Sequence, residues 1–367
     1  GEHSGDEHAA RMLKAALARE PDLNVVALGG DKLRQAGAQV ICDMMPYAIV
    51  GIFEILKHYG ELKQLRDAII DWILTYQPKT VCFVDYPGLN LRLAKILADR
   101  KATRKTGGSI RLVYYISPQV WAWKAKRRFQ MAELLDELAV IFRFEVETFA
   151  DTSLNTKFVG HPFVSAEYIL PMRYDANGPI LLLPGSRSGA ISRIAPVMFA
   201  AFRKLLEQRE SARAQCVYAS ETLKTLLESI LADFGDLKDR VELVPNSEAV
   251  EASAVLTSSG TMSLNCALSG IPGAIVYRIH PFTYVFGRIV LKIPYIGIAN
   301  LLLDRPMYPE LIQGDAKEDA LANQLIDCLE NPERIQRTRD ESEALRAILD
   351  KPSGGGAGKW LVENIKG

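Results

Sequence analysis

Short apolar runs alternate with longer amphipathic stretches along most of the chain. In the first half, the apolar runs occupy residues 24–28, 80–84, 110–116, 138–142 and 156–159. Residues 4–20, 60–76, 88–100 and 123–136 instead space their apolar positions as helices do. Near-continuous apolar strands separated by helices are typical of a parallel sheet covered on both faces. The first half therefore predicts an α/β domain.

The same pattern restarts in the second half. Strands are predicted at residues 179–183, 216–218, 241–244, 254–256 and 274–277, each with a helix behind it. The fold class predicted is α/β, with two doubly wound, Rossmann-like domains facing a central cleft. The predicted boundaries are 1–162 for the first domain, 163–178 for a linker, 179–350 for the second domain and 351–367 for a C-terminal helix that packs back on the first domain. The helix at residue 4 has no strand before it, so we expect the first strand of that domain to be missing from this sequence.

Composition narrows the class of protein. The 367 residues suit about two domains, and 44 basic residues balance 44 acidic ones. A net charge of 0 argues against a uniformly basic nucleic-acid binder. No run reaches the ~18 apolar residues of a membrane span. Five scattered cysteines suit buried thiols in a reducing compartment, and the five histidines lack metal-ligand spacing. We therefore expect a cytoplasmic, metal-independent protein.

Two turns between a strand and a helix are candidate phosphate sites. The first is Pro184-Gly185-Ser186-Arg187, and the second is Ser259-Gly260-Thr261. Backbone N–H groups at a helix start attract phosphate, and an arginine can bind its oxygens with two hydrogen bonds. The alternative is a plain turn with a solvated arginine and an ordinary helix cap. Neither turn matches GxxxxGK[ST], and GxGxxG is absent, which excludes a P-loop enzyme and weakens a nicotinamide enzyme.

Asp85 directly follows an apolar strand and precedes Tyr86-Pro87-Gly88. A carboxylate at the carboxyl end of a strand faces the ligand side of such a sheet, where it can act as a general base. The alternative is a cap for the helix that follows. Glu2 holds the equivalent place after the expected missing strand.

One apolar stretch and one basic aromatic stretch stand out in the first domain. The apolar stretch contains Ile49, Val50, Ile52, Phe53 and Leu56, and residues 121–128 combine two tryptophans with four cations. Core packing and a solvated helix face are the ordinary explanations. Together, the two stretches also suit a surface that enters a lipid headgroup layer.

Several short motifs occur together in one order. They are Gly1-Glu2-His3-Ser4-Gly5-Asp6, Val84-Asp85-Tyr86-Pro87, Ser117-Pro118-Gln119-Val120-Trp121-Ala122-Trp123, Gly160-His161-Pro162, Leu183-Pro184-Gly185-Ser186-Arg187, Ser259-Gly260-Thr261, Tyr277-Arg278, Asn300-Leu301-Leu302 and Pro309-Glu310-Leu311-Ile312-Gln313. With this series, the chain resembles the lipid-A-disaccharide synthase family over essentially its whole length. The resemblance implies a glycosyltransferase of the type B fold. It would join UDP-2,3-diacylglucosamine to 2,3-diacylglucosamine 1-phosphate with inversion at the anomeric carbon.

The resemblance also implies roles for individual residues. Asp85 would be the base and Glu2 a second carboxylate near the acceptor. The residues implied on the donor side are Gly185, Ser186, Arg187, Ser259, Gly260, Thr261, Arg278, Asn300, Glu310 and Gln313. Glu310 and Gln313, spaced as on one helical turn, match the family's donor-side helix.

The resemblance further implies how the protein is placed in the cell. Residues 49–56 would admit acyl chains at the inner face of the inner membrane. It implies a peripheral protein without a cofactor, and it suggests a homodimer.

The sequence departs from the family at two further positions. Many members have Glu where this chain has Asn265, so a ribose contact there would lack negative charge. Members often read PFE where this chain reads Arg143-Phe144-Glu145, which leaves the role of that segment open.

Two other functions remain open at this point. One is another UDP-sugar transferase or an epimerase with a soluble substrate, which would need no apolar entry. The other is a nucleotide-binding or membrane-scaffold protein without catalysis, in which Asp85 would be dispensable.

Overall fold

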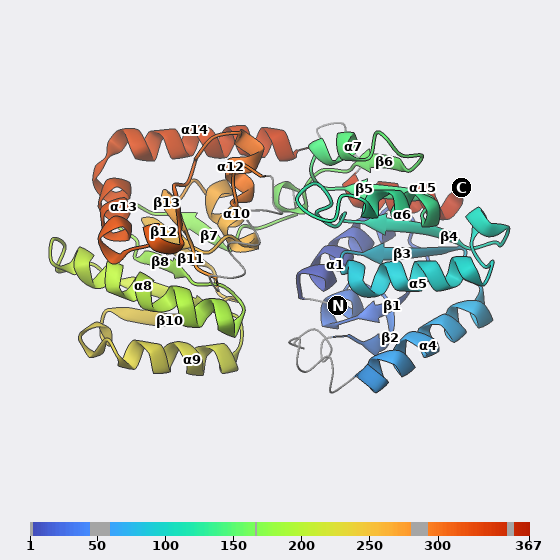
Figure 1. The fold of residues 1–367 in the computed structure, drawn as a ribbon, viewed down its shortest axis with the longest axis horizontal. Helices are drawn as coiled ribbons and strands as arrows, with labels where there is room; N and C mark the ends of the chain where they lie inside the picture. Colours follow the sequence, from blue (N-terminus) through green and yellow to red (C-terminus); the bar gives the residue numbers. More distant parts are fainter. Residues whose placement is uncertain (1–2, 45–58, 166, 280–292, 351–355) are drawn as a thin grey trace. The chain divides into compact units, whose positions relative to one another are not determined.

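The computed structural model describes residues 3–44, 59–165, 167–279, 293–350 and 356–367 (Figure 1). The chain divides into two compact units. Unit 1 comprises residues 1–166 together with 349–367, and unit 2 comprises residues 167–348. The chain therefore leaves unit 1, builds unit 2 and returns to unit 1 at its end.

Unit 1 contains parallel strands in two sheets. The strands are β1 (Val26–Gly29), β2 (Gln39–Asp43), β3 (Thr80–Val84), β4 (Arg111–Tyr115), β5 (Glu137–Val140) and β6 (Asn155–Phe158). β1 pairs with β2, and the other sheet has the order β3-β4-β5-β6. The helices are α1 (His3–Leu17), α2 (Asp31–Gln35), α4 (Tyr59–Tyr76), α5 (Pro87–Asp99), α6 (Arg127–Leu134), α7 (Phe144–Thr148) and α15 (Gly356–Lys366), with 3-10 turns η2 (Arg104–Thr106) and η3 (Pro162–Val164). Side chains of β4 and β5 are almost entirely buried, which explains their continuous apolar runs.

Unit 2 is built on a parallel sheet of order β10-β9-β8-β12-β13-β14. Its strands are β8 (Ile180–Leu183), β9 (Ala214–Tyr218), β10 (Val241–Pro245), β12 (Ala254–Thr257), β13 (Gly273–Tyr277) and β14 (Glu310–Ile312), and a separate pair joins β7 (Met172–Tyr174) to β11 (Val250–Ala252). The helices are α8 (Ser188–Leu206), α9 (Glu221–Ala232), α10 (Thr261–Leu268), α12 (Ile298–Leu303), α13 (Glu318–Glu330) and α14 (Pro332–Leu349), with 3-10 turns η4 (Gly235–Leu237) and η5 (Gln313–Asp315). The predicted α/β class with parallel sheets is confirmed.

The core of unit 2 forms where α8 meets the sheet. Ile191, Ile194, Met198, Phe202 and Leu205 of this helix are buried at intervals of three and four residues, so they form one apolar face. This face shares a core cluster with the strand residues and with helix α13. The packing fixes the start of α8 directly after β8, where a candidate phosphate turn lies.

The C-terminal helix α15 is anchored to unit 1 by a buried carboxylate. Glu137 of β5 is 3% exposed. It accepts hydrogen bonds from Trp360 Nε1 at 2.6 Å and from Asn364 Nδ2 at 3.0 Å, and Lys157 Nζ lies 3.1 Å away. A buried charge needs such partners, so the end of the chain completes this unit. In Figure 1, α15, drawn in red, lies among the blue and green elements of unit 1.

Two segments differ from the sequence-based expectations. Residues 172–174, inside the expected linker, form β7 and pair with β11 of unit 2. The expectation that Glu310 and Gln313 lie on a helix is wrong: Glu310 begins strand β14, and Gln313 follows it with φ 51°. Because β14 has only three residues, its spacing alone does not distinguish it from a helical turn.

Candidate functional site

The first candidate phosphate turn lies between β8 and α8. Gly185 has φ +115°, a backbone conformation that residues other than glycine rarely adopt, and a Cβ there would lie 3.3 Å from Ser258 Oγ. Ser186 and Arg187 are exposed. Arg187 is the N-cap of α8 and makes no cap hydrogen bond with its side chain. The turn thus presents backbone and a guanidinium at the start of a 19-residue helix.

The second candidate turn lies beside the first. β12 pairs with β8, with Thr257 opposite Leu183, and Ser258 N donates to Leu183 O at 2.8 Å (Figure 1). Gly260 is the N-cap of α10 and, like Arg187, provides no side-chain cap. The sheet therefore brings the starts of α8 and α10 together at the carboxyl ends of the two strands, with Ser259 in the loop before α10 and Thr261 as the first residue of this helix.

Arg278 and Gln313 border a hollow beside the first turns of α8. The hollow has a volume of about 500 Å³ and is also lined by Ser192, Arg193, Pro196 and Ile279. The Arg278 guanidinium donates to Ala316 O. The Gln313 amide bonds both the N–H and the carbonyl of Ile279 at 3.0 Å. These bonds hold the two side chains in place at the carboxyl ends of β13 and β14.

Glu310 and Asn300 are engaged with the protein itself. The Glu310 carboxylate accepts hydrogen bonds from Ile296 N at 3.0 Å, Gly297 N at 2.9 Å and Asn300 Nδ2 at 2.9 Å. Asn300 is fully buried and also bonds the backbone of Tyr308. In this structure both residues order the entry to α12.

Asn265 lies on the buried side of α10. It is 2% exposed, and its Oδ1 accepts a hydrogen bond from Tyr168 Oη at 3.0 Å. Sequence reasoning placed Asn265 among the donor-side candidates and left a ribose contact there open. The amide oxygen instead fastens α10 to the segment that precedes β7.

Asp85 occupies the turn between β3 and α5 in unit 1. Its backbone N–H donates to Tyr115 O at 3.0 Å, which continues the pairing of β3 with β4. Asp85 and Tyr86 have φ values of 46° and 48°, both in the left-handed region. Such a conformation costs roughly 1–3 kcal/mol per residue and clusters at functional sites. Pro87 then opens α5. The turn therefore fixes a carboxylate at the carboxyl end of a parallel strand.

The other site residues expected in the first domain lie outside the described residues. They are Glu2, Ile49, Val50, Ile52, Phe53 and Leu56. Their roles stay predictions.

Sequence reasoning assigned no role to three buried titratable groups of unit 1. Burial raises the pKa of Glu145 to about 8, and its Oε2 accepts a hydrogen bond from Phe142 N at 3.1 Å. Burial lowers the pKa of His8 to about 4 and that of His161 to about 3. His161 Nδ1 accepts from Phe163 N, which requires the neutral ring. Glu145 and His161 bond backbone N–H groups three and two residues away, but the burial that shifts their pKa values depends on the tertiary fold, which the sequence did not reveal.

These groups predict a pH dependence of stability. Folded His8 and His161 stay neutral while the unfolded chain protonates them below about 6.5, so stability falls as pH drops from about 6.5 toward 4. Folded Glu145 stays protonated while the unfolded chain ionises above about 4.5, so its contribution falls as pH rises from about 4.5 to 8. The two histidines and Glu145 change stability in opposite directions, so their summed contribution to the free energy of unfolding is greatest near pH 6.5. Comparing the thermal unfolding of Glu145→Gln with that of the parent chain at several pH values measures the contribution of Glu145 to stability. A stability difference that does not change between pH 5 and 8 would contradict it.

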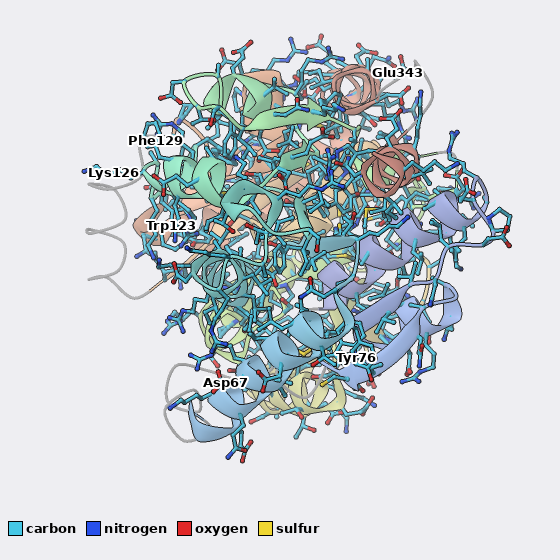
Figure 2. The ribbon with its side chains drawn as sticks, turned by 90° about the vertical axis from the view of Figure 1, so that its right-hand side faces the viewer. Asp67, Tyr76, Trp123, Lys126, Phe129 and Glu343 are labelled. Atoms are coloured by element: carbon cyan, nitrogen blue, oxygen red, sulfur yellow. The ribbon has the colours of Figure 1, made fainter. Side chains whose placement is uncertain are left out.

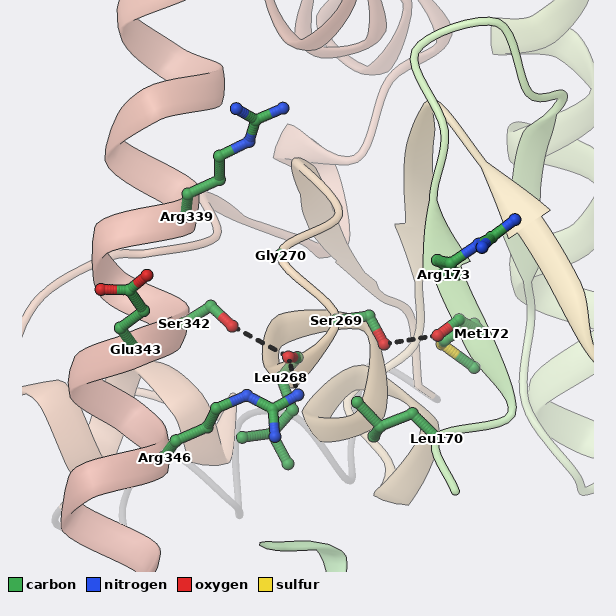
Figure 3. Close-up of a pocket in the computed structure, with 10 residues that line it drawn as sticks. All are labelled: Leu170, Met172, Arg173, Leu268, Ser269, Gly270, Arg339, Ser342, Glu343 and Arg346. Atoms are coloured by element: carbon green, nitrogen blue, oxygen red, sulfur yellow. Dashed lines mark hydrogen bonds between the residues drawn. The ribbon is translucent and has the colours of Figure 1, made fainter. Parts of the chain in front are cut away.

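A second hollow in unit 2, of about 490 Å³, has a different character (Figure 3). It lies where α10 ends, before β13 begins. Ser342 Oγ and Arg346 both donate to Leu268 O, and Ser269 Oγ donates to Met172 O. These polar groups tie α14 and β7 to the end of α10. The hollow therefore lies where β7, α10 and α14 pack together, away from the loops at the carboxyl ends of the strands.

The described residues show neither a metal-binding cluster nor a membrane-spanning helix. In the part of the chain that the structure describes, no group of three or more His, Cys, Asp or Glu side chains could hold a metal ion. Among those same residues, no helix combines the length and apolarity needed to cross a bilayer.

Solved structures share this arrangement of elements. A UDP-GlcNAc 2-epimerase from Neisseria meningitidis, bound to UDP-GlcNAc, matches with a TM-score of 0.62 and 12% identity, covering 98% of this chain and 97% of that one. The calicheamicin glycosyltransferase CalG4 matches with a TM-score of 0.57 and 13% identity, covering 100% of this chain and 95% of that one. The fold is thus that of type B glycosyltransferases and related epimerases.

Sequence comparison narrows this class to one family. The lipid-A-disaccharide synthetase family model matches residues 1–353. A lipid-A-disaccharide synthase from Geobacter sulfurreducens is 32% identical, covering 99% of this chain and 94% of the relative. Lipid-A-disaccharide synthase 1 from Legionella pneumophila is 34% identical, covering 95% and 91%. The chain belongs to the lipid-A-disaccharide synthase family and is a hexosyltransferase of lipid A biosynthesis, which confirms the resemblance seen in its motifs.

Proposed function

We propose that the chain transfers a 2,3-diacylglucosaminyl group from UDP to the 6-hydroxyl of 2,3-diacylglucosamine 1-phosphate. The bond from the acceptor oxygen to the anomeric carbon forms as the bond to the UDP oxygen breaks. The acceptor proton moves to Asp85, and UDP leaves with the electron pair. One in-line displacement converts the α-linked donor into a β-1,6 disaccharide, so no covalent intermediate on the enzyme is needed.

The pair of turns at β8 and β12 carries this proposal. Two helix starts at neighbouring strands direct N–H groups and positive dipole ends to one place. Arg187 adds a full positive charge with geometry suited to two phosphate oxygens. Charge that develops on the UDP oxygen as the bond breaks is stabilised by these fixed donors. Gly185 lets the diphosphate approach the backbone closely.

Other donor contacts are proposed at the neighbouring strand ends. The hollow bordered by Arg278 and Gln313 lies against the first turns of α8, so we place the uridine or the sugar there. Asn300 and Glu310 would act on the donor through the segment that they hold at Gly297. For Asn265, whose amide oxygen is bonded to Tyr168, no donor contact is proposed.

The acceptor would bind on unit 1, with its 6-hydroxyl at Asp85. Glu2 is proposed as a second carboxylate near the acceptor, and residues 49–56 as the entry for acyl chains. A homodimer, which the resemblance suggests, stays a prediction.

Epimerisation of a UDP-sugar is the second candidate, because an epimerase shares this fold. The two are distinguished by incubating labelled UDP-2,3-diacylglucosamine with acylated or deacylated acceptor and following UDP and disaccharide. We expect UDP release that depends on the acylated acceptor, with one disaccharide per UDP. Equal rates with deacylated substrates would contradict the lipid specificity. Isomerised UDP-sugar without acceptor would favour the epimerase.

We propose that unit 1 also contacts the inner face of the inner membrane. Trp123 and Phe129 are 45% and 43% exposed. Lys124 Nζ lies 4.5 Å from the Trp123 ring centre, and the Arg128 guanidinium carbon lies 4.3 Å from that of Phe129. Figure 2 shows Trp123, Lys126 and Phe129 along one side of the unit. Exposed aromatic rings among cations suit an anionic headgroup layer.

Vesicle binding tests this surface. Replacing both Trp123 and Phe129 by alanine should weaken binding to vesicles rich in phosphatidylglycerol about 10-fold or more, since each ring buries apolar area worth ~1.5–3 kcal/mol at most. Tyr76→Ala is the matched control, because Tyr76 is 67% exposed on α4 outside this surface. Sedimentation with vesicles measures the partitioning. Equal partitioning of the double variant and the parent chain would remove this surface from the proposal.

A further inference from the structure

The conformation of the Asp85 turn needs support from its surroundings. Asp85 and Tyr86 are consecutive in sequence, neither is glycine, and both have positive φ values. A pair of this kind persists only where neighbouring groups hold it. The Asp85 side chain projects from this backbone, so its direction depends on whatever fixes the turn.

Two side chains hold the carbonyl of Asp85. The Tyr114 hydroxyl donates to Asp85 O, and so does Asn90 Nδ2 at 2.6 Å. Asn90 Nδ2 also lies 3.2 Å from Val84 O. Tyr114 belongs to β4 and Asn90 to the first turn of α5, so the carbonyl is held from two separate elements.

Tyr114 is well suited to a fixed position. It is fully buried, and its ring packs beside Phe83 with centres 6.1 Å apart. Burial holds the pKa of its hydroxyl well above the usual range, so the group stays protonated and remains a donor. The bond to Asp85 O satisfies a buried polar group and fixes the turn at the same time.

We propose that Tyr114 and Asn90 are positioning residues that direct the Asp85 carboxylate toward the acceptor hydroxyl. Neither residue touches the reacting atoms. They act through the backbone of Asp85, and the inference therefore rests on the proposed role of Asp85 as the base. A small displacement of a catalytic group lowers the rate strongly, so the loss of one donor should be measurable.

A double-mutant cycle tests the inference. Tyr114→Phe removes a single oxygen and keeps the buried ring. We expect kcat to fall about 10-fold, with the donor KM within about twofold of the parent value. In the Asp85→Asn background, the same change should have no further effect on kcat, because the group being positioned is already lost. Asn90→Ala should behave in the same way.

Ser253→Ala is the matched control. It removes another buried hydroxyl that donates to a backbone carbonyl, that of Gly178 at 2.7 Å in unit 2. Its kcat should equal that of the parent. If Tyr114→Phe has the parent kcat while Asp85→Asn is slow, the inference is overturned but the proposed function stands. An equal loss in both backgrounds would show a merely structural role and would also overturn it. Wild-type turnover in Asp85→Asn would overturn the proposed function, and this inference with it.

Discussion

Asp85→Asn is expected to lower turnover by at least ~10²-fold while leaving UDP affinity nearly unchanged. The amide cannot take the proton from the acceptor hydroxyl, and loss of a general base costs 10²–10⁴-fold. Asparagine tolerates positive φ well, so the turn at φ 46° should keep its shape. We propose that UDP binds on unit 2, so calorimetry with UDP should give the parent affinity.

The control for this prediction lies at the other end of α5. Asp99 is exposed and pairs with Lys95 at 3.1 Å. Asp99→Asn makes the same chemical change outside the proposed site, so it should retain parent turnover. Parent turnover in Asp85→Asn would remove Asp85 from the mechanism.

Arg187→Ala is expected to weaken UDP binding about 10- to 100-fold and to slow turnover about 10²-fold. A hydrogen bond to a charged group contributes about 1.5–3 kcal/mol, which accounts for the loss of affinity. The additional charge on the leaving diphosphate accounts for the loss of rate. Arg187→Lys keeps the charge but cannot form two parallel hydrogen bonds, so its UDP affinity and its turnover should lie between those of the parent chain and those of Arg187→Ala.

Arg209 provides the matched control for this variant. It follows the far end of α8 and pairs with Glu330 at 3.1 Å on the surface. Arg209→Ala should bind UDP and turn over substrate as the parent chain does. If calorimetry gives Arg187→Ala the parent affinity for UDP, the β8–α8 turn does not hold phosphate.

The sequence was most informative where strands have continuous apolar runs. The strands predicted at 179–183 and 254–256 differ from β8 and β12 by a single residue each, and their apolar runs reflect burial on both faces. The strand predicted at 80–84 coincides with β3, although β3 lies at the edge of its sheet and is mostly half-buried. β2 was missed because none of its five residues is buried: exposed and half-buried positions alternate along it. β7, β11 and β14 have three residues each, too few to show a period.

The candidate site was predictable where chemistry follows strand order. Asp85, Gly185, Arg187 and Gly260 all lie within four residues of the end of an apolar strand, in the connection to the next helix. What local patterns do not contain is the set of partners. Tyr114 reaches Asp85 across 29 residues, and Tyr168 reaches Asn265 across 97.

The Glu310 carboxylate shows the same limit. Its motif resembles that of the family, but the motif does not reveal that its oxygens bond the backbone of residues 296 and 297. Such contacts depend on the tertiary fold, which brings β14 to the segment before α12.

A crystal structure with UDP and an unreactive acceptor analogue tests the proposed donor contacts of unit 2 and the proposed acceptor contact of unit 1. The account predicts diphosphate oxygens within hydrogen-bond distance of Arg187 and of the N–H groups at Gly185-Ser186 and Gly260-Thr261. It also predicts an Asp85 carboxylate oxygen about 3 Å from the acceptor 6-hydroxyl. UDP bound away from both turns, or an acceptor hydroxyl far from Asp85 while UDP is in place, would contradict it.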